Sequence, residues 1–242
     1  MKVNVFNTTE KIIEALAKLI IEIGKKAILD KNQFTFVLSG GNSPKKLFQL
    51  LASADYRNQL DYSKVFFFFG DERYVPHNHA DSNYLMAKEA MLDALSIPEH
   101  RVFKVDTSLD PATAAQDYER HICEFFNDEP VFDFILLGLG DDAHTASIFP
   151  NTSLIWIDEE MVKEVYLEHK QVHRISFTAP LINKANHVAF LTFGANKADA
   201  IKAVFEQEKH YNKYPAQLIN PESGNLYWFV DDAAVSKLDQ KF

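Results

Sequence analysis

The chain has 242 residues, 47% of them hydrophobic and 20 of them phenylalanine, and its formal net charge is −9. This composition can bury a sizeable core, which excludes disorder, and it lacks the basic surface that nucleic-acid binding needs. Cys123 is the only cysteine, which excludes an internal disulfide and favours a reducing, cytoplasmic compartment. Residues 1–6 predict the start of a strand, and charges interrupt every apolar run. Neither a secretion leader nor a membrane span is therefore expected.

The first third of the chain alternates amphipathic and apolar segments. A capping sequence at residues 7–10 precedes apolar residues at helical spacing up to Ile23. Phe34–Leu38 predicts a buried strand, and a glycine-rich turn at residues 39–43 leads into a helix. Ser43 is the expected N-cap of that helix and Pro44 its first residue. A second apolar strand is predicted at Val65–Phe69, with a helix at residues 81–95 behind it.

The same alternation continues to the end of the chain. A helix is predicted at residues 113–126 and an apolar strand at 132–137. Later strands are predicted at 162–167, 172–177, 187–193 and 227–230, with a helix at 195–205. Continuous apolar strands between amphipathic helices are typical of a parallel sheet covered on both faces. We therefore predict an α/β fold with a Rossmann-like, mostly parallel sheet, as a single domain over residues 1–242.

Residues 132–150 carry the most informative pattern in the chain. An apolar strand ends in two glycines, two aspartates and then His144. Ligands of open α/β sheets bind at the edge where such strands end. There, His144 can accept a proton from water near neutral pH, and Asp142 can orient its ring. The alternative is a histidine whose hydrogen bonds are satisfied by the backbone of a tight turn.

Other segments carry candidate ligands for an anion, which a chain of net negative charge must hold with local cations. The amides of a glycine-rich turn at a helix N-terminus suit a phosphate, although an ordinary turn has the same sequence. Arginine forks suit bidentate phosphate binding, and an arginine inside an apolar strand is costly unless it reaches an anion or water. The candidates are Gly40, Gly41, Asn42, Ser43, Asp71, Arg73, Arg174 and Lys197.

Two other motifs are weaker. His77 and His79 could bind a metal, but no third ligand follows at a typical spacing, so a turn is favoured. Residues 138–143 match a G-x-G-x-x-A dinucleotide motif. Two carboxylates in the loop would repel a pyrophosphate, and Pro150 interrupts the helix that should follow. A nicotinamide or flavin is not expected.

Five segments together resemble 6-phosphogluconolactonases, from the family that also contains glucosamine-6-phosphate deaminases. In order they are LSGGNSPKKLFQLL, FFGDERYVPHNHADSNYLMAKEAML, FILLGLGDDAHTASIFP, HRISFTAPLINKANHVAFLTFGANKADAI and PAQLINPESGNLYWFVD. In the deaminase branch the histidine is typically followed by Ile-Ala-Phe-Asn-Glu-Pro. Here residues 145–150 follow the lactonase form, Thr-Ala-Ser-Ile-Phe-Pro.

The resemblance implies hydrolysis of 6-phospho-D-glucono-1,5-lactone to 6-phosphogluconate in the oxidative pentose phosphate pathway. It implies His144 as general base, Asp142 as its partner, and a phosphate and sugar clamp of Arg73, Arg174 and Lys197. Backbone amides of the turn at residues 40–41, or of the turn at Gly140, would stabilise the oxyanion. Neither a metal nor a cofactor is expected. The alternatives are a glucosamine-6-phosphate deaminase or isomerase and a non-catalytic sugar-phosphate sensor.

The chain departs from the family pattern at two positions. Ala143 stands where the family has glycine before the histidine, which costs about 1 kcal/mol or more if the backbone there needs a positive φ. Asn42 stands where the family commonly has serine or threonine. Neither change removes an ionisable group from the expected site.

Overall fold

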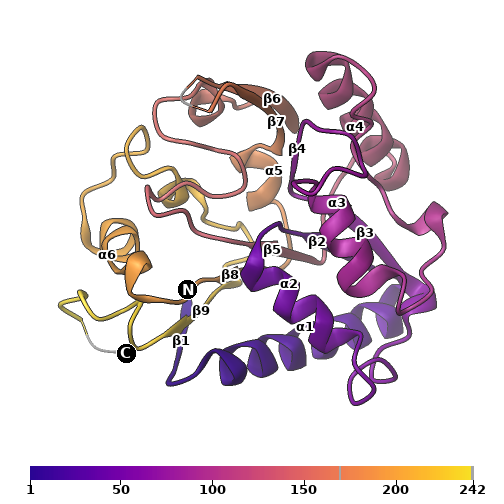
Figure 1. Cartoon of the computed structure of the whole chain (residues 1–242), viewed down its shortest axis with the longest axis horizontal. Coiled ribbons are helices and arrows are strands. Elements are labelled where there is room, and N and C mark those ends of the chain that lie inside the picture. The colour runs from indigo at the N-terminus through magenta and orange to yellow at the C-terminus, as the bar shows by residue number, and fades with distance from the viewer. Residues whose placement is uncertain (169, 241–242) are drawn as a thin grey trace.

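Six parallel strands form the central sheet of the computed structural model, which describes residues 1–168 and 170–240 (Figure 1). In spatial order the strands are β1 (Lys2–Phe6), β9 (Leu226–Asp231), β8 (Val188–Leu191), β5 (Phe134–Leu137), β2 (Phe34–Leu38) and β3 (Val65–Phe69). Every residue of β2, β5 and β8 is buried. These strands are continuously apolar because both faces of the sheet are covered.

Helices cover both faces of the sheet and create two cores. Alternate residues of β2 point to opposite sides, so Phe36 belongs to a core with α1 and α2, whereas Val37 belongs to a core with α4 and α6. The helices are α1 (Thr9–Lys31), α2 (Asn42–Leu51), α3 (Asn83–Ala87), α4 (Pro111–Phe126), α5 (Ala179–Asn183) and α6 (Ala198–Glu206). This arrangement confirms the predicted Rossmann-like, single-domain α/β class.

A second, antiparallel sheet lies beside the first. It contains β4 (Asp71–Arg73), β7 (Val172–Phe177) and β6 (Val162–Leu167), with β7 in the middle. The sequence predicts β6 and β7 but shows no strand pattern at residues 71–73, which are all charged. These three residues form a strand because they pair with β7, which is distant in the sequence.

Helix boundaries differ from the sequence predictions at three places. Residues 81–95 contain α3 and then a π-helical turn, Lys88–Leu92, instead of one helix. The helix predicted at 195–205 begins with a 3-10 turn, Ala195–Lys197, before α6. The expected N-cap was wrong for α2, because the helix begins at Asn42 with Gly41 as its cap. Gly41 has a φ of 105°, which glycine adopts readily.

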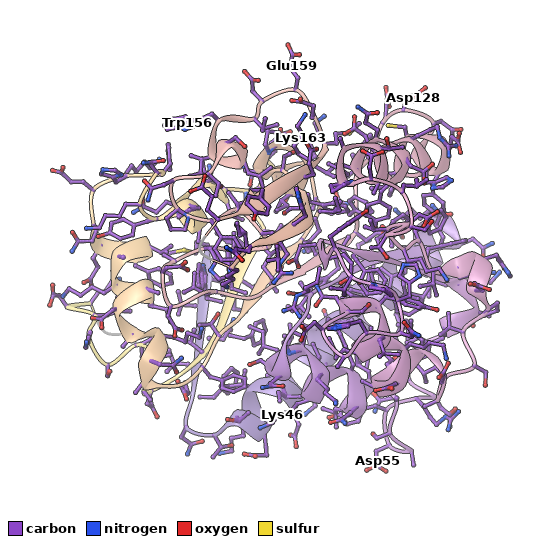
Figure 2. The ribbon with its side chains drawn as sticks, turned by 45° about the horizontal axis from the view of Figure 1, so that its top comes forward. Lys46, Asp55, Asp128, Trp156, Glu159 and Lys163 are labelled. Atoms are coloured by element: carbon purple, nitrogen blue, oxygen red, sulfur yellow. The ribbon has the colours of Figure 1, made fainter. Side chains whose placement is uncertain are left out.

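Short 3-10 turns complete the described secondary structure, at Tyr62–Lys64, Glu99–Arg101, Ser153–Trp156 and Pro215–Leu218. Charged side chains lie at the periphery, as Lys46, Asp55 and Asp128 do in Figure 2. None of the helices in the described residues combines the length and apolar character needed to cross a bilayer.

The strand order brings three predicted site segments to one edge. β2 pairs in parallel with both β3 and β5, so the carboxyl ends of the three strands are neighbours. The turn after β2, the strand β4 after β3, and the turn after β5 therefore meet there, as expected for an open α/β sheet.

Candidate active site

A cavity of about 300 Å³ opens at this edge of the sheet. Its walls come from the segments that follow β2 and β5, from β4, from β7 and the turn before it, and from the turn before α6. Six of the residues singled out from the sequence line it: Gly40, Asp71, Arg73, His144, Arg174 and Lys197. The folded chain thus brings residues from five separate segments to one small space.

His144 and Asp142 form a hydrogen-bonded pair at the rim of this cavity. The His144 Nδ1 atom lies 2.5 Å from Asp142 Oδ1, and the His144 amide donates to the same oxygen at 3.2 Å. Partial burial disfavours the Asp142 carboxylate, but the hydrogen bonds and charge of His144 outweigh it and lower the Asp142 pKa to about 2. Asp142 is therefore ionised at neutral pH.

The His144 imidazole is held by a ring-stacking contact as well as by its hydrogen bond to Asp142. It stacks on Phe149, with ring centroids 3.8 Å apart and an interplanar angle of 22°. A quarter of the His144 side chain is exposed to solvent. Because Nδ1 is occupied by Asp142, the nitrogen left to exchange a proton is Nε2.

The turn that carries the pair is closed by backbone hydrogen bonds. The Gly140 amide donates to the His144 carbonyl at 2.8 Å, and the Ala143 amide donates to the Gly140 carbonyl at 3.0 Å. A Cβ atom at Gly140 would lie 2.0 Å from His144 Nδ1, so glycine is required there for close approach. Ala143 has a φ of 62°, the left-handed conformation in which alanine is strained.

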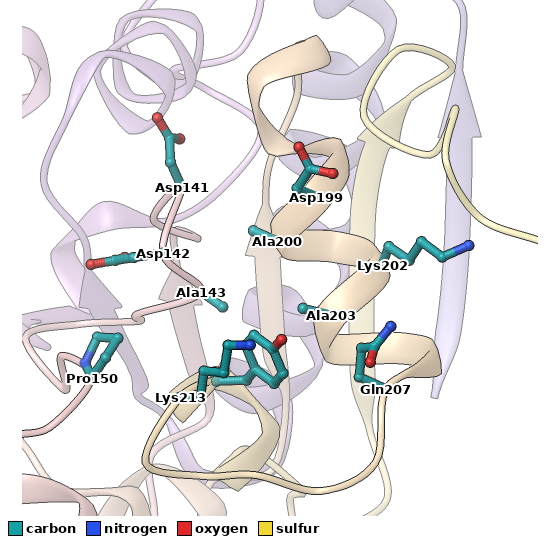
Figure 3. Close-up of a pocket in the computed structure, with 11 residues that line it drawn as sticks. Asp141, Asp142, Ala143, Pro150, Asp199, Ala200, Lys202, Ala203, Gln207 and Lys213 are labelled. Atoms are coloured by element: carbon teal, nitrogen blue, oxygen red, sulfur yellow. The ribbon is translucent and has the colours of Figure 1, made fainter.

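A second cavity, of about 520 Å³, lies on the other side of this turn (Figure 3). Asp142 and Ala143 form one of its walls and α6 the other. Figure 3 shows the Asp142 carboxylate pointing away from α6, consistent with its bond to His144. None of the predicted clamp residues lines this larger cavity in the described structure, so the smaller cavity is the candidate active site.

Two arginines are cross-strand neighbours in the antiparallel sheet. Arg73 of β4 and Arg174 of β7 are directly opposite in the register. The Arg73 Nη1 atom donates to the Asp81 carbonyl at 2.8 Å. Burial, and then the charge of Arg73, lowers the pKa of Arg174 below its usual range. Like charges placed opposite each other are destabilising, and an anion between them removes that repulsion.

Lys197 and Asp71 are the other ionisable residues of the predicted site. The Lys197 Nζ atom pairs with Asp141 Oδ1 at 2.5 Å, which holds the ammonium at the cavity wall. Asp71 Oδ2 accepts a hydrogen bond from Ser147 Oγ at 2.7 Å, and the Asn83 side-chain amide donates to the Asp71 carbonyl at 2.8 Å. A carboxylate suits a sugar hydroxyl, which can donate to it, better than a phosphate.

The glycine-rich turn after β2 meets the cavity only through Ser39 and Gly40. Gly41, Asn42 and Ser43 do not line it. In the described part of the chain, the amides of residues 40–43 donate no hydrogen bond to another protein group. They differ in this from the amides of Gly140, Ala143 and His144, all of which are occupied. The two turns predicted as oxyanion donors are thus distinguished by their hydrogen bonds.

Sequence reasoning missed three features of the cavity. Phe149, on which the imidazole stacks, was not singled out, although it lies five residues after His144. Ser147 was not among the candidate binding residues, whereas its hydroxyl donates a hydrogen bond to Asp71. Lys170, in the turn between β6 and β7, also lines the cavity. Its only sequence signal is that it lies four residues before Arg174.

Comparisons with known proteins identify the class. The family described as glucosamine-6-phosphate isomerases/6-phosphogluconolactonase matches residues 7–228, and the chain belongs to this family. A 6-phosphogluconolactonase of Synechocystis sp. is 43% identical over 218 residues, which are 88% of each chain. The chloroplastic 6-phosphogluconolactonase 3 of Arabidopsis thaliana is 35% identical over 98% of this chain and 75% of its own length.

Solved structures agree with this assignment. The 6-phosphogluconolactonase from Trypanosoma cruzi has a TM-score of 0.88 at 28% identity, over 99% of this chain and 97% of that one. The enzyme from Trypanosoma brucei has a TM-score of 0.85 at 27% identity, over 98% of both chains. The family resemblance seen in the sequence is thereby confirmed.

Proposed function

We propose that this protein, as one domain over residues 1–242, hydrolyses 6-phospho-D-glucono-1,5-lactone to 6-phosphogluconate, a step of the oxidative pentose phosphate pathway. The observation that carries the proposal is the placement of the His144–Asp142 pair at the same cavity as three cationic side chains. The named activity of its relatives supports the same substrate. The lone cysteine favours a cytoplasmic location.

The reaction begins with a water molecule at His144 Nε2. The imidazole takes a proton as the water oxygen attacks the lactone carbonyl carbon, giving a tetrahedral oxyanion. The Asp142 carboxylate, held at Nδ1, stabilises the imidazolium that forms. The oxyanion then re-forms the carbonyl and breaks the ring C–O bond, and the imidazolium returns its proton to the leaving oxygen. The leaving group is part of the substrate ring, so the reaction requires neither a metal nor a covalent enzyme intermediate.

Substrate binding uses the cations and the unoccupied amides. Arg73, Arg174 and Lys197 are the proposed phosphate clamp, and the unoccupied amide of Gly40 is a further donor at the cavity. The amides of the 40–41 turn are better placed to stabilise the oxyanion than those of the Gly140 turn, since the latter donate within the protein. Asp71 is assigned to a sugar hydroxyl.

The test of the base is His144→Ala. The lactone would be generated in situ from glucose 6-phosphate, and its decay followed above the spontaneous rate. Loss of the base is expected to lower the rate by about 10²- to 10⁴-fold. His121→Ala is the control, because His121 is an exposed histidine on α4. An undiminished rate in the His144 variant would reject this residue as the base.

Two further measurements separate the alternatives. Ammonia release from glucosamine 6-phosphate would identify a deaminase, whereas tight phosphosugar binding without any turnover would identify a sensor. The sequence after His144 and the relatives' names favour hydrolysis over both.

A further inference from the structure

Lys170 is a fourth cation at the cavity, and no part of the mechanism above uses it. We propose that Lys170 is an additional substrate-binding residue, which closes on the phosphate group and sets affinity for the substrate without affecting turnover. This inference rests on the proposed lactonase function, because it concerns the same cavity and the same anionic substrate.

The contacts of Lys170 leave its ammonium available. Its side chain is exposed, in the turn between β6 and β7, and its Nζ atom lies 5.0 Å from the ring centroid of Phe149. Within residues 1–168 and 170–240, no carboxylate pairs with it. Lys197, by contrast, is already bound to Asp141 at 2.5 Å. An exposed cation–π contact is weak, so an anion in the cavity can draw the ammonium away from the ring.

The charge of the substrate indicates which of its groups Lys170 binds. Before the reaction, the lactone carbonyl is neutral and the phosphate carries the only charge. An exposed lysine on a flexible stem is poorly suited to stabilising an oxyanion, which requires donors already fixed in position. Such a lysine is suited to binding the phosphate, which is already charged when the substrate enters the cavity. Lys170 lines the same cavity as Arg73, Arg174 and Lys197, so an anion held by the proposed clamp lies in the space that Lys170 borders.

The overall charge of the protein makes such a residue useful. A net charge of −9 repels a phosphorylated substrate at long range, and this repulsion must be offset locally. An exposed ammonium at the cavity meets the incoming anion before the half-buried Arg174 does.

Steady-state kinetics of Lys170→Met and Lys170→Arg test the proposal. We expect KM for the phosphorylated lactone to rise about tenfold in the methionine variant, with kcat unchanged, because an interaction made equally in the ground and transition states is lost. The arginine variant should keep most of the affinity. Lys213→Met is the matched control, since Lys213 Nζ also lies 5.0 Å from an aromatic ring, that of Tyr214, but outside this cavity.

Competitive inhibition by inorganic phosphate identifies the group that Lys170 contacts. Its inhibition constant should rise by the same factor as KM in Lys170→Met. An unchanged KM, a fall in kcat at constant KM, or an unchanged phosphate inhibition constant would each overturn the proposal. If the wild-type protein did not accelerate lactone hydrolysis, the proposed function itself would fail, and that result is distinct from the others.

Discussion

At the scale of single residues, the turn that carries His144 combines a favourable hydrogen-bonded pair with a strained backbone. Asp142 and His144 are two residues apart, and the residue between them takes a left-handed conformation that turns both side chains to one side. The Ala143 side chain is buried, and its carbonyl accepts a hydrogen bond from the Ala216 amide at 3.0 Å. Because Ala143 has a positive φ, the expected cost of about 1 kcal/mol or more for alanine in place of the family's glycine applies to this protein.

This geometry predicts different changes in the free energy of unfolding for two substitutions of Ala143. Ala143→Gly relieves the left-handed strain but adds entropy to the unfolded chain and removes a buried methyl group, so its free energy of unfolding should stay within about 1 kcal/mol of wild type. Ala143→Val should lose about 3 kcal/mol or more, because a branched side chain at positive φ is strained and overpacked.

Denaturant unfolding and lactonase rates would check both variants. The glycine variant should retain activity, and the valine variant should lose it along with stability. A valine variant as stable as wild type would contradict the assigned backbone strain.

At the scale of elements, a buried carboxylate joins β4 to α3. Glu72 Oε1 accepts hydrogen bonds from the amides of Arg73 and Asn83, both at 2.7 Å, and Oε2 accepts from the Tyr84 amide at 2.8 Å. Ser82 Oγ donates to Oε2 at 3.2 Å. Burial raises the pKa of Glu72, while these amide bonds oppose the shift. Glu72 thereby holds the strand that carries Arg73.

Glu72→Gln places an amide nitrogen where two donors point at a carboxylate oxygen. Leaving buried donors unpaired costs about 1–3 kcal/mol each, so the free energy of unfolding should fall by about 2–4 kcal/mol. KM should rise as well, since the Arg73 strand loses its anchor. Exposed Glu89→Gln, in the same region, should change stability by less than about 0.5 kcal/mol. Equal stabilities of the two variants would reject this role of Glu72.

At the scale of the whole molecule, the Asp142–His144 pair makes the free energy of unfolding depend on pH in the acid range. The pKa of Asp142 is about 2 in the folded protein, below the value of about 3.9 of an unperturbed aspartate. A carboxyl group with a lowered pKa stabilises the fold above its unfolded pKa, and that stabilisation is lost as pH falls through the folded value.

The stability of wild type and Asp142→Asn should therefore converge in acid. The difference in their free energies of unfolding should be full near pH 5 and should shrink as pH falls from about 4 to about 2. Thermal or denaturant unfolding across this range measures it, with exposed Asp55→Asn as the control for the substitution itself. A difference that grows in acid would reverse the assigned sign.

The sequence by itself determined the layers and the contact between Asp142 and His144. Continuous apolar strands required a parallel sheet covered on both faces, and this held for β2, β3 and β5. Asp142 and His144 are near neighbours in the chain, so their contact needed only a local turn. The family followed from motifs in a fixed order.

The tertiary structure alone decided how the cations meet. β4 has three charged residues and no apolar periodicity, so its strand exists only through pairing with β7, and that pairing sets Arg73 opposite Arg174. Likewise, the position of Lys170 at the cavity depends on where the β6–β7 hairpin folds. Local patterns specify elements because they record burial along one segment. Contacts between distant segments depend on packing that no single segment contains.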